Sequence, residues 1–175
     1  MKKLQLEELG RISVDEFRTS VKMPVVILLD NVRSLHNVGS AFRTADAFRC
    51  ERIVLTGITG TPPHREIHKT ALGATDSVAW EYELLPEDAV LKMKQAGYKI
   101  VVIEQTTESL PLQKFDTKMG DRICLVFGNE INGVSEKIIA LADTAVEIPQ
   151  SGTKHSLNIS VCVGIVCWEL AKRLV

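Results

Sequence analysis

Short runs of apolar, mostly β-branched residues recur along the chain and are separated by Gly, Pro, Asn or Asp. Runs of this length with such boundaries are typical of β-strands. Within each run the apolar residues are nearly continuous and do not alternate with polar ones, as expected for strands buried on both faces. The pattern predicts six strands, at Val25–Leu29, Arg52–Thr56, Ser77–Trp80, Lys99–Ile103, Ile123–Phe127 and Ala145–Ile148.

Segments with helical spacing lie between these strands. Gly97 follows one of them as a C-cap, and Ser135 begins another as a capping residue. The alternation of strands and helices predicts an α/β fold in which a mostly parallel, six-stranded sheet is flanked by helices. The predicted helices are Asn37–Phe48, Glu66–Leu72, Glu87–Ala96, Ser135–Ala142 and, last, about Leu157–Leu174.

The length of 175 residues and the hydrophobic content of 45% fit one globular domain. We expect residues 23–175 to form this domain and residues 1–22 to form a short helical extension. The first eight residues lack the apolar core of a secretory signal. No apolar run approaches the roughly 18–20 residues that cross a bilayer. These features predict a cytoplasmic protein without a membrane role.

The last predicted helix is apolar almost all round up to Glu169. Such a helix must be buried on most sides. Two environments meet this condition: the centre of a single subunit, or an interface between two subunits. The pattern alone does not decide between them.

Charge is distributed unevenly, although the formal net charge is only −1. Residues 1–70 contain 11 Lys and Arg against 8 Asp and Glu, whereas residues 71–175 contain 10 against 14. A nonspecific polyanion binder would be basic throughout. Any nucleic-acid surface is therefore expected to be a local patch that supplies a few phosphate contacts.

The cysteines and histidines form no recognisable disulfide or metal pattern. None of the four cysteines has Cys-x-x-Cys spacing, and three lie in apolar runs, where a reduced cysteine behaves as a small apolar residue. His64 and His68 have the i, i+4 spacing of two helical metal ligands, but no third ligand lies nearby, which favours an exposed basic loop. We expect neither disulfides nor a metal.

Three separated segments carry the candidate chemistry. No Gly-x-Gly loop follows the first predicted strand, where a dinucleotide-type fold would have one. Three of the four glycines at predicted loop tips lie in the C-terminal half, so a nucleoside cofactor is expected to bind there. The segments are Leu29–Arg43 (LDNVRSLHNVGSAFR), Leu125–Gly133 (LVFGNEING) and Ile148–Ser160 (IPQSGTKHSLNIS).

In this order, the three segments resemble the motifs of the SpoU/TrmH family of RNA 2′-O-ribose methyltransferases, within the SPOUT superfamily. The resemblance covers roughly residues 23–173. It implies a C-terminal segment threaded into a deep trefoil knot, S-adenosylmethionine (AdoMet) bound in that knot, and a homodimer that buries the C-terminal helix. Topology rules normally exclude knots, so the knot is implied by the resemblance alone.

The resemblance assigns five polar residues to catalysis, and each also has a structural alternative. Asn37 and Arg43 belong to the first motif and are expected near the same end of one helix face; alternatively, Asn37 caps the helix and Arg43 is a solvated charge. Glu130 would hold Arg43 or a row of backbone amides; alternatively, it is an ordinary loop residue between two glycines. Ser156 and Asn158 would alternatively cap the last helix.

The implied reaction moves a methyl group from the AdoMet sulfonium to a ribose 2′-hydroxyl. That hydroxyl is a weak nucleophile, so its proton must leave or the developing alkoxide must be stabilised. A guanidinium stays protonated, so we expect Arg43 to lower the hydroxyl pKa and bind the adjacent phosphate, not to act as a free base. The proton would leave through Ser156, Glu130 or water, while Asn37 and Asn158 orient the reactants.

The resemblance places main-chain cofactor contacts at Gly128, Ile148 and Leu157. Phe127 would add an apolar wall, and Gln105 belongs to a loop that would form a fourth wall, because open α/β sheets hold ligands at the carboxyl ends of their strands.

Basic residues near the motif loops are the candidates for RNA contact. The chain has only 5% aromatic residues and no aromatic platform, so recognition is expected through backbone shape and a splayed nucleotide. Simple solvation is the alternative for the basic loop that contains Pro62 and Pro63. The candidates are Arg33, His64, Arg65, Lys69, Lys154 and His155.

The sequence is interpreted as an AdoMet-dependent RNA 2′-O-methyltransferase with transfer RNA as the preferred substrate. Ribosomal RNA is an alternative, although family members that modify it often carry an extra N-terminal domain, whereas about 22 residues precede the first predicted strand here. Methylation of a base nitrogen and a noncatalytic RNA-binding module are further alternatives. The complete set of five polar residues favours catalysis at the ribose.

Overall fold

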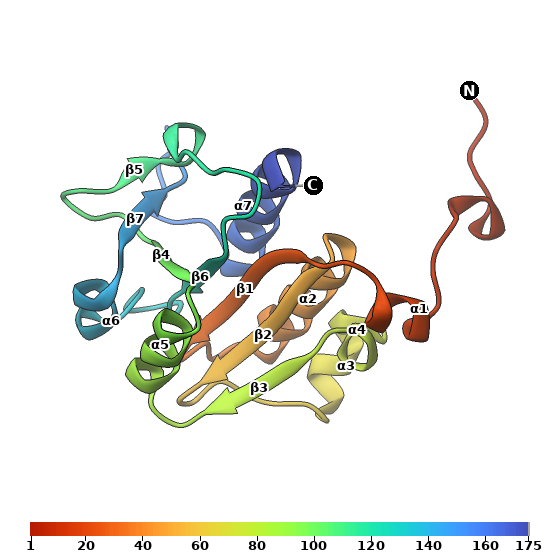
Figure 1. Cartoon of the computed structure of the whole chain (residues 1–175), viewed down its shortest axis with the longest axis horizontal. Coiled ribbons are helices and arrows are strands. Elements are labelled where there is room, and N and C mark those ends of the chain that lie inside the picture. The colour runs from red at the N-terminus through yellow and green to blue at the C-terminus, as the bar shows by residue number, and fades with distance from the viewer. Residues whose placement is uncertain (175) are drawn as a thin grey trace.

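The computed structural model describes residues 1–174, apart from the side chains of Leu6 and Glu7. Seven parallel strands form one sheet in the order β3-β2-β1-β6-β4-β7-β5 (Figure 1). The expected α/β class and parallel sheet are confirmed, whereas the expected count of six strands was wrong. The strands are β1 (Met23–Asp30), β2 (Cys50–Thr56), β3 (Trp80–Glu83), β4 (Lys99–Ile103), β5 (Leu110–Pro111), β6 (Ile123–Phe127) and β7 (Thr144–Glu147).

Two layers of helices cover the two faces of the sheet. Helices α2, α3, α4 and α7 pack on one face, and α5 and α6 pack on the other (Figure 1). The helices are α1 (Val14–Thr19), α2 (Leu35–Ala47), α3 (Arg65–Ala71), α4 (Ala74–Ser77), α5 (Pro86–Gln95), α6 (Glu136–Leu141) and α7 (Ile159–Leu174), with 3-10 turns η1 (Leu6–Leu9) and η2 (Leu112–Lys114).

Strand β1 shows why the apolar runs are continuous. Val25, Ile27 and Leu29 contribute to the core under α2 and α7, whereas Val26 and Leu28 contribute to the core under α5 and α6. Successive side chains of a strand point to opposite faces, so a strand covered on both sides needs apolar residues at every position.

The two edge strands are where the predictions differ from the structure. The strand predicted at Ser77–Trp80 was wrong, because residues 74–77 form α4 and β3 begins only at Trp80. Most of β3 is exposed, so it lacks the apolar run that marks a buried strand. Strand β5 has two residues, Leu110 and Pro111, which is too short to leave a pattern.

The remaining helices lie within two residues of their predicted bounds. Helix α2 begins at Leu35 and is capped by Ser34, whose hydroxyl accepts a hydrogen bond from the Asn37 N–H at 3.3 Å. The alternative in which Asn37 is the cap is therefore wrong. Ser135 is the N-cap of α6, and Gly97 has a left-handed φ of 84° directly after the C-cap of α5.

The N-terminal segment forms η1 and α1 before the first strand and extends from the main body (Figure 1). Phe17 is the only residue of α1 that is buried, and it packs into the core beside Met23. The Ser13 hydroxyl and the Glu16 carboxylate form a capping box at the start of this helix. No helix among the described residues is long and apolar enough to cross a membrane.

Helix α7 has one buried side and one exposed apolar side. Val163, Val166 and Leu170 pack on the sheet and are essentially inaccessible. Ile165 and Trp168 remain 37% and 59% exposed in the single chain. Burial on most sides, which the sequence predicts, is therefore incomplete within one subunit.

Candidate active site

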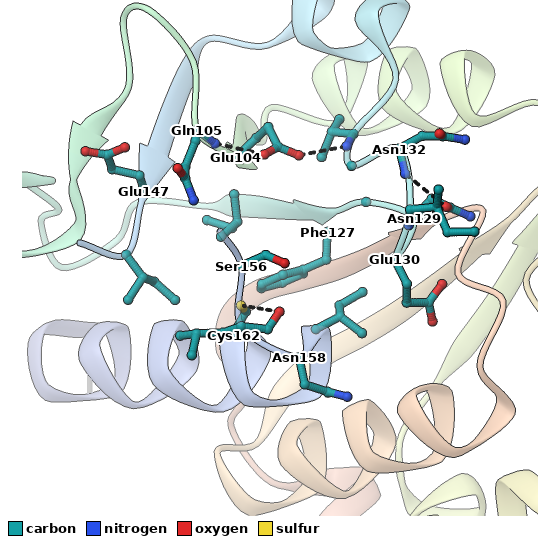
Figure 2. Close-up of a pocket in the computed structure, with 18 of the residues that line it drawn as sticks. Glu104, Gln105, Phe127, Asn129, Glu130, Asn132, Glu147, Ser156, Asn158 and Cys162 are labelled. Atoms are coloured by element: carbon teal, nitrogen blue, oxygen red, sulfur yellow. Dashed lines mark hydrogen bonds between the residues drawn. The ribbon is translucent and has the colours of Figure 1, made fainter. Parts of the chain in front are cut away.

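A cavity of about 690 Å³ opens at the carboxyl ends of β4, β6 and β7 (Figure 2). Three loops, after these strands, and the start of α7 form its walls. Open parallel sheets bind ligands at this edge, and the volume lies within the range of about 300–1,000 Å³ for small-molecule sites. All five predicted cofactor residues line it: Gln105, Phe127, Gly128, Ile148 and Leu157. Their role in binding stays a prediction.

Gly128 allows the loop after β6 to fold back on itself. A Cβ at this position would lie 2.1 Å from the Gly133 carbonyl carbon and 2.1 Å from the Val134 nitrogen. Asn129 and Gly133 exchange two backbone hydrogen bonds of 2.9 Å, which close the loop into a tight turn. Only glycine fits the close approach that shapes this wall of the cavity.

Replacing Gly128 with alanine is expected to weaken AdoMet binding by at least about tenfold, because backbone atoms at 2.1 Å cannot yield without moving the cavity wall. Isothermal calorimetry measures the dissociation constant. Gly152→Ala is the matched control, since no atom lies within 4 Å of a Cβ built there. Equal losses in the two variants would contradict the steric role of Gly128.

Two acidic residues that the sequence did not single out hold this loop in place. The Glu104 carboxylate, at the end of β4, accepts hydrogen bonds from the N–H groups of Gln105 and Val134 at 2.9 and 3.0 Å. The buried Asp30 carboxylate, at the end of β1, accepts one from the Ser135 N–H at 3.1 Å. Acidic residues at the carboxyl ends of buried apolar runs are the sequence signal that could have found both.

Glu130 joins the second motif to the first. Its carboxylate accepts hydrogen bonds from the N–H groups of Arg33 and Ser34 at 2.9 and 3.0 Å and from the Asn37 amide at 3.1 Å. Partial burial raises the pKa of Glu130, but these donors outweigh the effect and leave the pKa below its usual range. The alternative in which Glu130 holds an amide row is thus observed, and the ionised carboxylate is a poor proton acceptor.

Asn37 and Arg43 do not lie on one face of α2, contrary to the prediction from sequence. Six residues correspond to a rotation of about 240° around a helix with 3.6 residues per turn, so the two side chains leave α2 in different directions. Asn37 faces Glu130 beside the cavity. Arg43 lies in a separate hollow and does not contact Glu130.

The hollow around Arg43 has a volume of about 430 Å³ and lies between α2 and α3. The side chain of Arg43 is exposed and has no hydrogen bond or ion pair with any described residue. Lys69 also lines the hollow and pairs with Glu66 at 2.7 Å. Phe48, at the rim, contacts Trp168 of α7 with ring centroids 6.1 Å apart. The hollow therefore adjoins the exposed apolar side of α7.

The third motif supplies the lower wall of the cavity. Ser156 and Asn158 both line it (Figure 2). The Asn158 side-chain oxygen accepts hydrogen bonds from the Ser160 N–H and hydroxyl at 2.8 and 2.7 Å, so the capping alternative is realised for Asn158. Its amide nitrogen has no acceptor among the described residues and can donate to a ligand. The Gln105 amide donates a hydrogen bond to the His155 carbonyl at 2.8 Å and connects this loop to the loop that follows β4.

The predicted RNA-binding residues fall into three surface groups. Arg33 lies beside the cavity, where its backbone is held by Glu130. His64, Arg65 and Lys69 belong to the start and body of α3, and the His64 ring accepts a hydrogen bond from the Glu66 N–H at 3.1 Å. Lys154 and His155 are exposed in the third motif loop. Within the described part of the chain, no group of three or more His, Cys, Asp or Glu is placed to hold a metal.

Comparisons with protein families and with curated proteins both match this chain to RNA methyltransferases. The model of the SpoU rRNA Methylase family matches residues 24–168. A tRNA (guanosine(18)-2′-O)-methyltransferase of Aquifex aeolicus is 31% identical over 150 residues, which cover 85% of this chain and 69% of the relative. Eight curated relatives are matched over 56% to 69% of their length, so the chain is shorter than each of them.

Solved structures of this family have the same fold. A TrmH/SpoU tRNA modifying enzyme of A. aeolicus superposes with a TM-score of 0.81 and 28% identity, covering 91% of this chain and 80% of that one. An AdoMet-bound rRNA methyltransferase of Sinorhizobium meliloti gives a TM-score of 0.81 and 28% identity, covering 94% and 62%. Because the family model spans most of its length, the chain belongs to the SpoU rRNA methylase family.

Proposed function

We propose that this chain is an AdoMet-dependent RNA methyltransferase that methylates a ribose 2′-hydroxyl. The cavity at the ends of β4, β6 and β7 carries this proposal. Phe127, Ile148 and Leu157 give it the apolar walls that an adenine ring requires, and loop backbone groups offer hydrogen bonds to the ring edge. Bound there, AdoMet would supply an electrophilic methyl group on a sulfonium.

Calorimetric titration with AdoMet tests the binding step. The proposal predicts saturable binding with one site per subunit, and Gly128→Ala provides the variant in which the cavity wall is displaced. Absence of heat at millimolar AdoMet, with a folded protein, would remove the enzyme interpretation and leave the noncatalytic module.

Transfer RNA is the preferred substrate in this proposal, and ribosomal RNA is the alternative. The A. aeolicus relative that modifies guanosine 18 of tRNA supports the first choice. Several relatives named as 23S rRNA guanosine 2′-O-methyltransferases support the second. All of them act on a ribose oxygen, which favours the ribose over a base nitrogen.

In this proposal some polar residues position the reactants and others stabilise charge that develops during the reaction. Glu130 fixes the loop before α2 and the Asn37 amide, so that Asn37 is held at the cavity mouth. Ser156 and Asn158 face the same space. Arg43, with its fixed positive charge, would bind the phosphate beside the target ribose and stabilise the developing alkoxide. Since Glu130 has a lowered pKa, the proton would leave through Ser156 or water.

We infer that α7 forms a twofold interface and that two subunits share each active site. Val161, Ile165 and Trp168 form an exposed apolar stripe on a helix whose other side is buried. The Arg43 hollow adjoins this stripe through Phe48. A symmetric pair of subunits would therefore bring Arg43 of each close to the cavity of the other, which explains why Arg43 lies apart from its own.

Family membership also supports a knotted C-terminal segment. In the sheet order, β7 lies between β4 and β5, and α7 packs against the segment that follows β5. Arg173 of α7 donates a hydrogen bond to the Phe115 carbonyl in that segment. An experimental electron-density map traced through residues 104–160 tests the threading.

A further inference from the structure

The cavity carries an excess of negative charge. Four glutamates line it, and no Lys, Arg or His belongs to the described residues that do so. Glu104 directly follows β4, and Glu147 is the last residue of the neighbouring strand β7. The pairing of the two strands continues through a 3.0 Å hydrogen bond from the Glu104 N–H to the Val146 carbonyl. Figure 2 shows both carboxylates around the cavity, with Ser156 below them.

No cationic side chain among the described residues forms an ion pair with these glutamates. The Glu104, Glu130 and Glu147 carboxylates accept hydrogen bonds from backbone amides, an Asn37 amide and the Ser109 hydroxyl, all of which are neutral donors. None of the ion pairs between described residues involves a cavity glutamate. Like charges on neighbouring strands repel, so the glutamates give the cavity a potential that favours a cation.

We propose that these glutamates make the cavity bind the cationic sulfonium cofactor more tightly than its neutral thioether product, S-adenosylhomocysteine. The inference rests on the proposed function. On transfer, the S–CH₃ bond breaks and an electron pair of the ribose oxygen forms the O–CH₃ bond. The sulfur keeps the pair of the broken bond and becomes neutral, and the hydroxyl proton leaves to water. The ligand thus loses one positive charge, while its ammonium and carboxylate groups are unchanged.

The consequence is a cavity that releases its product more readily than its substrate. One carboxylate that lines a partly solvated cavity changes the affinity for a unit charge by about two- to fivefold. Glu147 and Glu136 are the clearest tests. Glu104 also holds the Val134 amide, so its replacement would disturb the wall as well as the charge.

The experiment compares dissociation constants for AdoMet, S-adenosylhomocysteine and sinefungin, whose amine gives a positive charge near the sulfonium position without a transferable methyl group. Calorimetry is performed on the full chain, on Glu147→Gln and Glu136→Gln, and on Glu81→Gln. The last variant removes the same charge from an exposed residue of β3, at the other half of the sheet.

Each cavity variant is expected to weaken the binding of AdoMet and sinefungin by about two- to fivefold and to leave the affinity for the neutral product within about 1.5-fold. The loss of affinity for the two charged ligands should become smaller as the salt concentration rises from about 0.05 to about 0.5 M. Glu81→Gln should change none of the three dissociation constants. Equal changes for charged and neutral ligands, or none, would overturn the inference while the proposed function stands. If neither AdoMet nor the product binds the unaltered chain, the proposed function itself fails and the inference with it.

Discussion

Arg43→Ala is expected to lower the rate of methyl transfer by at least about 100-fold and to change AdoMet affinity by less than about threefold. Arg43 lies outside the cavity that would hold the cofactor, so its loss removes no cofactor contact within the subunit. The rate falls because no fixed cation remains beside the target phosphate and the developing alkoxide. Single-turnover kinetics and calorimetry on the same preparation measure the two effects separately.

Arg43→Lys should also be nearly inactive, because a lysine is a point charge and cannot hold a phosphate through two parallel hydrogen bonds. Arg11→Ala, which removes an exposed arginine before α1, is the matched control and should retain full activity. Near-normal turnover of the lysine variant would refute the role of the guanidinium geometry.

If two subunits share each active site, mixed dimers of two inactive variants should recover a defined fraction of the activity. When Arg43→Ala and Asn158→Ala subunits are mixed and allowed to exchange at random, about half of the dimers contain one of each. Each mixed dimer would have one site with both residues intact, so about a quarter of the unaltered activity should return. If Arg43 served the cavity of its own subunit, the mixture would stay inactive.

A charge on the exposed side of α7 is expected to separate the subunits without unfolding them. Ile165 and Trp168 are 37% and 59% exposed in the single chain, so Ile165→Glu combined with Trp168→Glu places charges where the isolated subunit faces water. At an apolar interface the same charges would be buried without partners, at a cost of several kcal/mol. Sedimentation should then shift from twice the subunit mass of 19.4 kDa to that mass.

Two control variants distinguish loss of the interface from a general effect of an added charge. Val21→Glu, at a valine that is 89% exposed outside α7, should leave the assembly unchanged. Val166→Glu, on the buried side of α7, should unfold the subunit, and circular dichroism distinguishes this outcome from dissociation. A stable and fully active monomer of the unaltered chain would contradict both the interface and the shared site.

The interior of the sheet could be predicted from sequence because burial on both faces leaves a clear pattern. β1 and β6 are continuous apolar runs and lie where the runs predict. β3 could not be placed, because an exposed edge strand such as Trp80–Glu83 has no reason to be apolar. The burial of α7 could not be predicted either, because a sequence shows which residues are apolar but does not show which chain buries them.

The candidate site was predictable where chain direction fixes position. Gly128 and Ile148 follow parallel strands, and the carboxyl ends of parallel strands lie at one edge of the sheet. The relation of Asn37 to Arg43 was predicted wrongly because sequence proximity on one helix was taken as proximity in space. Glu104 was missed because its importance comes from the Val134 amide, which lies 30 residues away along the chain.

The most direct test of the account is to locate the transferred methyl group. Unmodified tRNA and rRNA transcripts are incubated with the protein and AdoMet labelled in its methyl group, digested to nucleosides, and separated by chromatography with mass detection. We expect label in a 2′-O-methylribonucleoside, at a higher rate for tRNA, and none with Arg43→Ala. Label confined to a methylated base, or no label in either RNA despite measurable AdoMet binding, would contradict ribose methylation.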